Sequence, residues 1–273
     1  MPLHSTFIIV VTMIVTFILP FFALVSSQPA DGPEARLIVN GSLADIRDYP
    51  YVARINPLAY PYGTTNFGFG GATIISNRWI LTAAHNLDGY PDDDVPVVGV
   101  KIRVGISSLN ETGQVVDAEL RRCHPLYELK LINVNDICLL KTADVLEFNE
   151  KVQPADLPTL DDMSFTLVNV TGFGDTEKDS SVELRTTKMK IGSTDKCKEV
   201  DSTYNEISDV CFFNHYESSN PSFGDSGSGF VARRKDGSPV VLSLLSASNG
   251  NCHIGPFVLL YTVWIKRVME EHT

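Results

Sequence analysis

The chain has 273 residues, of which 44% are hydrophobic and 20% are charged, so it can form one large domain or two small ones around a buried core. Its formal net charge of −11 argues against a nucleic acid or an anionic membrane surface as the partner. No basic patch and no phosphate-binding glycine loop stands out, and the charge instead favours solubility.

The N-terminal segment is the most apolar part of the chain. Residues 7–25 are broken only by two threonines and Pro20, and small polar residues follow. This pattern predicts a secretory signal peptide over residues 1–27, with a short propeptide rich in Pro, Gly and Ala over residues 28–37. A retained membrane anchor is the alternative, but Pro20 and the polar exit favour cleavage.

From residue 38 onward, short runs of Val, Ile, Leu and Thr alternate with clusters of Gly, Pro, Asn and Asp. The predicted strands include residues 72–75, 100–104, 137–140, 167–171, 188–191 and 240–245. Short strands at this spacing predict an all-β barrel or sandwich. Apolar residues at helical spacing between Thr262 and Glu270 predict one amphipathic helix at the end.

Two polar surface features lie between the predicted strands. Asn110 stands in a turn-like N-glycosylation sequon and is expected to carry a glycan, whereas glycosylation at Asn40 and Asn169 stays open. The insertion at residues 87–98 contains three consecutive aspartates. Because spaced oxygen ligands are missing there, we expect a solvated loop and no metal.

Three residues with the chemistry of nucleophilic catalysis follow one another along the chain. His85 ends an apolar run, Asp136 opens another, and Ser226 lies between glycines in Gly224-Asp225-Ser226-Gly227. The glycine-flanked serine alone could be an ordinary turn. However, a histidine can take the hydroxyl proton of a serine, and an aspartate can fix the histidine tautomer. The order His, Asp, Ser is one of those known for this triad.

Five segments in chain order carry a family resemblance. They are Ile38-Val39-Asn40-Gly41, Leu81-Thr82-Ala83-Ala84-His85, Asn135-Asp136-Ile137, Gly224-Asp225-Ser226-Gly227 and Trp264-Ile265. Together they resemble the chymotrypsin-like (trypsin-fold) serine protease family over about residues 38 to 270. The resemblance implies that His85 is the general base, that Asp136 orients it and that Ser226 is the nucleophile. The backbone N–H groups of Gly224 and Ser226 would form the oxyanion hole.

The resemblance also implies the architecture and the partners. We expect an all-β fold of two six-stranded antiparallel β-barrels, with the active site in the crevice between them and a C-terminal α-helix. The peptidase domain would span residues 38–273, with the first barrel over about 38–155, the second over about 156–262 and the helix over about 262–271. Such a protein is a secreted monomer without cofactor or metal. Its partners are protein or peptide substrates and serpin-type or other protease inhibitors, with no nucleic acid and no membrane.

Activation in this family frees an amine that pairs with the aspartate before the nucleophile. The counterparts here are Ile38 and Asp225. Leu37 would then precede the cut, although a cut after the basic residue Arg36 is the alternative. Because a Leu37 start would fit the amine pocket badly, we expect cleavage after Leu37.

The five cysteines depart from the family pattern. Cys197 and Cys211 keep the spacing of one family disulfide, which the resemblance implies is formed. The cystine that normally flanks the catalytic histidine is absent, because Gly70 and Asn86 stand at its positions. Ser222 replaces another family cysteine, which leaves Cys252 without its usual partner. A bridge between Cys123 and Cys138 stays open, since the fold would place them on neighbouring strands.

The substrate pocket is expected at Asn220, Ser246 and Ser248. The neutral amide of Asn220, at the position of the pocket base, argues against a preference for Arg or Lys at P1, the substrate residue before the cleaved bond. Ser248 in place of a glycine narrows the pocket, which favours small or medium apolar residues. The expected function is a serine endopeptidase made as a zymogen and acting through an acyl-enzyme. The alternative is a weak or inactive homologue that acts as a binding protein.

Overall fold

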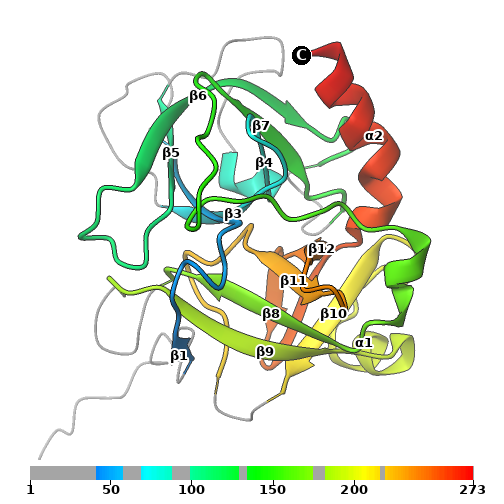
Figure 1. The fold of residues 1–273 in the computed structure, drawn as a ribbon. Helices are drawn as coiled ribbons and strands as arrows, with labels where there is room; N and C mark the ends of the chain where they lie inside the picture. The colour runs from blue at the N-terminus through cyan, green and yellow to red at the C-terminus, as the bar shows by residue number, and fades with distance from the viewer. Residues whose placement is uncertain are drawn as a thin grey trace, which may run out of the picture. The chain divides into compact units, whose positions relative to one another are not determined.

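The computed structural model describes residues 41–57, 69–87, 99–128, 134–174, 182–215 and 219–272. These residues form mostly β-structure with a long C-terminal helix (Figure 1). The predicted signal peptide and propeptide, the activation residues Leu37 and Ile38, and the three consecutive aspartates of the 87–98 insertion lie outside the described residues. In the part of the chain that is described, no helix is long and apolar enough to cross a membrane.

The first β-unit is a closed barrel of six antiparallel strands, which confirms the first predicted barrel. Around the barrel the strands follow the order β2 (Val52–Pro57), β3 (Gly70–Ile74), β4 (Trp79–Thr82), β7 (Cys138–Thr142), β6 (Gln114–Cys123) and β5 (Val100–Val104). In β5 the alternate residues Val100, Ile102 and Val104 are buried, because successive side chains of a strand point to opposite faces. They join an apolar interior that includes Ile55, Ile80 and Leu140.

The second β-unit is a sheet of eight strands. Its main path runs through β12 (Pro239–Leu244), β11 (Gly229–Arg233), β8 (Leu167–Gly172), β9 (Arg185–Ile191), β10 (Asp209–Asn214), β14 (Cys252–Pro256) and β13 (Ala247–Asn249). Phe212 and Phe230 stack in its core with ring centroids 3.8 Å apart. The closure of this sheet into a second six-stranded barrel stays a prediction.

The eighth strand, β1 (Ser42–Leu43), departs from the expected first barrel of residues 38–155. It pairs with β9 in the second sheet, where Ser42 lies opposite Thr186. The Arg185 guanidinium donates to the Gly41 carbonyl at 2.9 Å, and the Ala44 amide donates to Leu184 at 2.9 Å. These contacts hold the start of the described chain on the second sheet.

Four helical segments complete the described structure: η1 (Ala84–Leu87), η2 (Leu160–Ser164), α1 (Thr194–Val200) and α2 (Val258–Glu271). The sequence predicted only the last, and α2 begins at Val258 rather than at Thr262. The reason is that the first turn is apolar, with Val258 and Tyr261 buried, so it lacks the polar residues that mark helical periodicity.

An apolar cluster joins the barrel, the second sheet and α2. It includes Leu139 from the barrel, Leu244 from the sheet, and Tyr261 and Ile265 from α2. Figure 1 shows α2, in red, starting beside β12 of the second sheet and running along the side of the barrel that carries β4 and β7. Ile137 belongs to this cluster and is fully buried, so the chain next to Asp136 is anchored where the β-units meet.

Candidate active site

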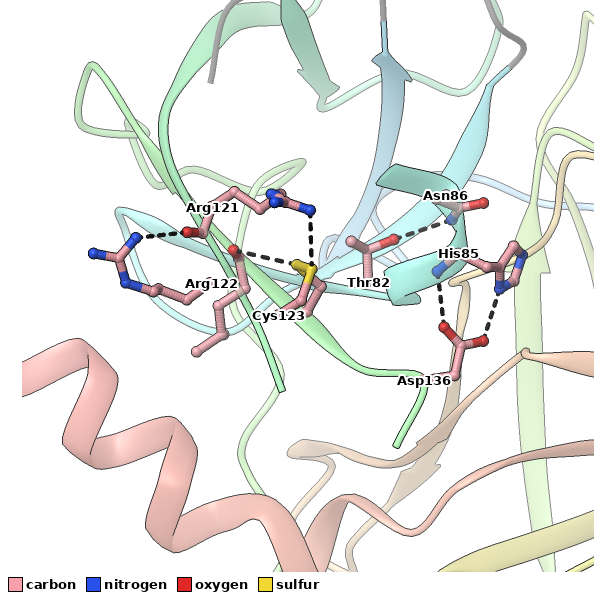
Figure 2. Close-up of a disulfide and its surroundings, with 9 residues drawn as sticks. Thr82, His85, Asn86, Arg121, Arg122, Cys123 and Asp136 are labelled. Carbon is pink, nitrogen blue, oxygen red and sulfur yellow. Dashed lines mark hydrogen bonds and ion pairs between the residues drawn. A yellow bond between two sulfur atoms is a disulfide. The ribbon is translucent and has the colours of Figure 1, made fainter. Parts of the chain in front are cut away.

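His85 and Asp136 are brought together by the pairing of two barrel strands. Thr82, at the end of β4, lies opposite Cys138, at the start of β7, so η1 and the loop before β7 are neighbours. His85 Nδ1 lies 2.7 Å from Asp136 Oδ2, and the His85 backbone N–H donates to Asp136 Oδ1 at 2.9 Å (Figure 2). A carboxylate that accepts from Nδ1–H fixes the ring and leaves Nε2 as the proton acceptor.

Asp136 is held as a buried anion. Its residue surface is 1% exposed, and the Ser246 hydroxyl donates to the same Oδ2 that faces His85. Burial raises the pKa of Asp136, but hydrogen bonds from His85 and Ser246 lower it more, so the net shift is downward. The predicted pocket residue Ser246 is therefore placed against the carboxylate.

The helix α2 supports the loop that carries Asp136. Asn135 has a φ of 53°, in the left-handed region that asparagine tolerates better than most residues. The Tyr261 hydroxyl of α2 donates to Asn135 Oδ1 at 3.1 Å, and the Ile137 amide donates to the Asn135 carbonyl at 2.8 Å. Both bonds fix the turn from which Asp136 points toward His85.

Ser226 lies on a turn that only glycines can complete. Gly224 has a φ of 90° and Gly227 a φ of 84°, and a Cβ on Gly224 would lie 2.1 Å from the Phe69 ring. The Gly71 amide donates to the Ser226 carbonyl at 2.8 Å, which attaches the turn to β3 of the barrel. Ser226 is half-buried and lines an open cleft of about 680 Å³.

Asn86 is a site residue that the sequence did not reveal. Its Nδ2 donates to the Ser226 carbonyl at 2.8 Å and to the Thr82 hydroxyl at 3.2 Å. A Cβ on Gly70 would lie 2.5 Å from this amide, so Asn86 occupies the space beside the glycine. The two positions that lack the family cystine are thus in contact, and the Asn86 amide joins η1 to the Ser226 turn.

Asp225 is completely buried beneath this turn. Its Oδ1 accepts from the Gly174 amide at 2.8 Å, and its Oδ2 accepts from the Ser222 amide at 3.0 Å. A Cβ on either Gly172 or Gly174 would lie 2.3 Å from one of the carboxylate oxygens, so both glycines are needed for this close approach.

The cysteines form two disulfides, Cys197–Cys211 and Cys123–Cys138. Figure 2 shows Cys123 on β6, beside the chain that leads to Asp136. Cys252 is a buried free thiol packed with Cys197 and Cys211, and burial raises its pKa to about 11. Asn110, the expected glycosylation site, is exposed in a turn between β5 and β6.

The expected pocket residues Asn220, Ser246 and Ser248 all line the cleft beside Ser226. His253 lines it too, and no local sequence signal marked that residue. Within the described ranges, no group of three or more His, Cys, Asp or Glu side chains is arranged to hold a metal ion.

Comparisons with known proteins identify the family of the chain. The Trypsin family model matches residues 38–265. Ovochymase of Halocynthia roretzi is 32% identical over 87% of this chain, and complement C1s subcomponent of Bos taurus is 28% identical over 86%. Trypsin, alkaline C of Manduca sexta is 36% identical over 49% of this chain. These matches span only 15%, 36% and 48% of the respective relatives.

Among solved structures, one titled HL collagenase superposes with a TM-score of 0.73. It is 25% identical, and the match covers 85% of this chain and 98% of that chain. The family match extends over most of the sequence and includes every residue placed above at the Ser226 cleft. The chain therefore belongs to the trypsin family of serine proteases.

Proposed function

We propose that the chain is a secreted serine endopeptidase, made as a zymogen, that hydrolyses peptide bonds through an acyl-enzyme. The observation that carries the proposal is the pair of hydrogen bonds, 2.7 and 2.9 Å long, by which buried Asp136 holds His85. They orient the ring so that Nε2 is the nitrogen that would act as the base, and the adjacent Asn86 fastens the Ser226 turn to the same helix.

In the proposed reaction, His85 Nε2 accepts the hydroxyl proton of Ser226 while Ser226 Oγ attacks the scissile carbonyl carbon. The backbone N–H groups of Gly224 and Ser226 stabilise the oxyanion. The C–N bond then breaks, His85 returns the proton to the leaving amine, and an ester to Ser226 remains. Water, deprotonated by His85, hydrolyses that ester and restores the serine. Asp136 stays ionised and stabilises the imidazolium.

Secretion and zymogen activation are part of the same proposal. The N-terminal apolar run supports a signal peptide over residues 1–27, and two disulfides suit an oxidising compartment. The exposed side chain of Asn110 is accessible for a glycan. Cleavage after Leu37 would free the Ile38 amine for the buried Asp225 carboxylate, which borders the Gly224–Ser226 turn.

A fluorophosphonate probe tests the catalytic part of this proposal. The chain processed to Ile38 should be labelled at Ser226, because the probe reacts with an activated serine hydroxyl. Ser226→Ala should abolish labelling and peptide hydrolysis while leaving the thermal unfolding temperature within a few degrees of wild type. Absence of labelling in a folded, correctly processed chain would instead favour a binding homologue.

A further inference from the structure

The cleft beside Ser226 has a polar floor. Ser248 of β13 lies directly opposite His253 of β14, and side chains of such a cross-strand pair share one face of the sheet. Ser248 Oγ lies 2.8 Å from His253 Nδ1, and His253 Nε2 lies 3.2 Å from Asn220 Oδ1. His253 is only 1% exposed, so it lies buried at the bottom of the cleft and not at its opening.

The hydrogen-bond roles in this floor can be assigned in sequence. Asn214 Nδ2 donates to Asn220 Oδ1, which is therefore an acceptor. His253 Nε2–H must then donate to the same oxygen, which leaves Nδ1 of a neutral ring to accept from the Ser248 hydroxyl. Burial lowers the pKa of His253 to about 4, which agrees with a neutral ring at neutral pH.

Two hydrogen-bonding groups remain for a ligand. Among the described residues, the Asn220 Nδ2 amide has no hydrogen-bond partner, and it supplies N–H donors. Ser248 Oγ, whose proton is directed to His253, supplies lone pairs. No Asp, Glu, Lys or Arg is among the described residues that line the cleft, so Asn220, Ser248 and neutral His253 offer no charge to pair with a charged side chain.

We propose that this floor selects a P1 side chain ending in a carboxamide, with glutamine as the preferred residue. The oxygen of the P1 side-chain carboxamide accepts from Asn220 Nδ2, and an N–H of the same carboxamide donates to Ser248 Oγ. A carboxylate offers no donor to Ser248 and brings an uncompensated charge, while an apolar side chain leaves both groups unpaired. His253 is a positioning residue, because it holds Asn220 and Ser248 in these roles. This replaces the apolar preference expected from Ser248 alone.

The proposal rests on the proposed endopeptidase function and deepens it. A set of peptides that differ only at P1 tests it, because Gln, Glu and Met are similar in length and differ mainly in the end group. For the chain processed to Ile38, kcat/KM for Gln should exceed that for Glu, Met and Lys by at least about tenfold, the size expected from two buried hydrogen bonds. Equal or higher values for any of the other three would overturn the proposal.

Single substitutions in the floor measure the contribution of each of its residues to the P1 preference. Asn220→Asp should reduce kcat/KM for P1 Gln at least about tenfold and raise that for P1 Lys, since the donor becomes an anion. Asn149→Asp adds the same charge in an exposed loop after β7 and should leave the order of P1 residues unchanged. His253→Leu should reduce the ratio of Gln to Met, and Ser248→Ala provides the same test without altering a buried ring. An unchanged ratio in both variants would contradict the assignment.

Fluorophosphonate labelling distinguishes the failure of this proposal from failure of the proposed function. A chain that labels but prefers Met, Glu or Lys has the chemistry and lacks the proposed pocket. If the probe does not label the chain, the affinity of the same peptides for Ser226→Ala measures the selectivity of the pocket without catalysis. The Gln peptide should then bind at least about tenfold more tightly than the Glu and Met peptides, and equal binding would overturn the proposal.

Discussion

The amide of Asn86 connects the helix that carries His85 to the peptide that carries Ser226. It donates to the Ser226 carbonyl at 2.8 Å, beside a second bond from the Gly71 amide to the same oxygen. The family resemblance implies a cystine at the positions of Gly70 and Asn86. The hydrogen bond therefore connects η1, which carries the proposed base His85, to the Ser226 turn, whereas a cystine would connect η1 to the barrel strand β3.

Asn86→Asp should slow catalysis more than it weakens substrate binding. The substitution keeps the shape but places a carboxylate oxygen against the Ser226 carbonyl, so we expect kcat to fall about tenfold or more with KM within about threefold. The measurements are kcat, KM and the fluorophosphonate labelling rate.

The double variant Gly70→Cys/Asn86→Cys is the matched control, because it removes the amide and allows the family cystine to form. It should recover most of the labelling rate, whereas Gly70→Cys alone should destabilise the fold, since its Cβ meets the Asn86 amide. A normal labelling rate in Asn86→Asp, with only a lower unfolding temperature, would assign Asn86 a purely structural role.

At the scale of elements, the start of β10 carries a buried carboxylate. Asp209 is 6% exposed and accepts from the Asn205 amide and the Ser208 hydroxyl, each at 3.0 Å. Burial is the main cause that raises its pKa from 3.8 to about 6, and the two hydrogen bonds oppose it. The folded state thus binds a proton here more tightly than the unfolded state does.

This shift predicts a loss of stability between about pH 4 and pH 6. In that window the folded protein holds the Asp209 proton and the unfolded chain has released it, so the free energy of unfolding falls as the pH rises. Asp209→Asn should remove this contribution, roughly 1–3 kcal/mol in total. Urea unfolding of both proteins at several pH values measures the difference, and parallel curves would contradict the predicted linkage.

Elements with strong local signals were predictable from the sequence. β5 is found at residues 100–104 as expected, because Val100, Ile102 and Val104 alternate with polar residues. The triad segments lie together in space, although their roles stay proposals. The site residues that the sequence did not reveal depend on contacts between distant segments. His253 faces Ser248 through sheet pairing, and Asn86 was noted only because it stands at the position of a missing cysteine. Neither contact has a local pattern that reveals it.

At the scale of the whole molecule, the proposed activation links the N-terminus to the Ser226 turn. Asp225 is fully buried and lies within hydrogen-bonding distance of the Gly174 and Ser222 amides. A carboxylate in such a position is stabilised by a cation, which the freed Ile38 amine would supply. Leu37 at the terminus would displace that amine by one residue.

Two engineered cleavage sequences test which residue must be the new N-terminus. One should release a chain that starts at Ile38, and the other a chain that starts at Leu37. We expect the Ile38 chain to be at least about tenfold more reactive toward fluorophosphonate, because loss of one buried ion pair disorders the oxyanion turn. Mass spectrometry verifies each terminus. Equal reactivity would show that activation does not depend on the Ile38 amine.

The segments that carry His85 and Asp136, the proposed base and its orienting carboxylate, are fastened to their neighbours in chemically different ways. Asp136 stands two residues before Cys138, whose disulfide to Cys123 covalently joins β7 to β6. The helix of His85 is fastened to the Ser226 turn by an amide that thiols do not attack. Reducing conditions would therefore break the link behind Asp136 and leave the link between the His85 helix and the Ser226 turn in place. Of the two disulfides, Cys123–Cys138 is the one next to the proposed pair, so its reduction would reach the strand that follows Asp136 and leave the Asn86 hydrogen bond intact.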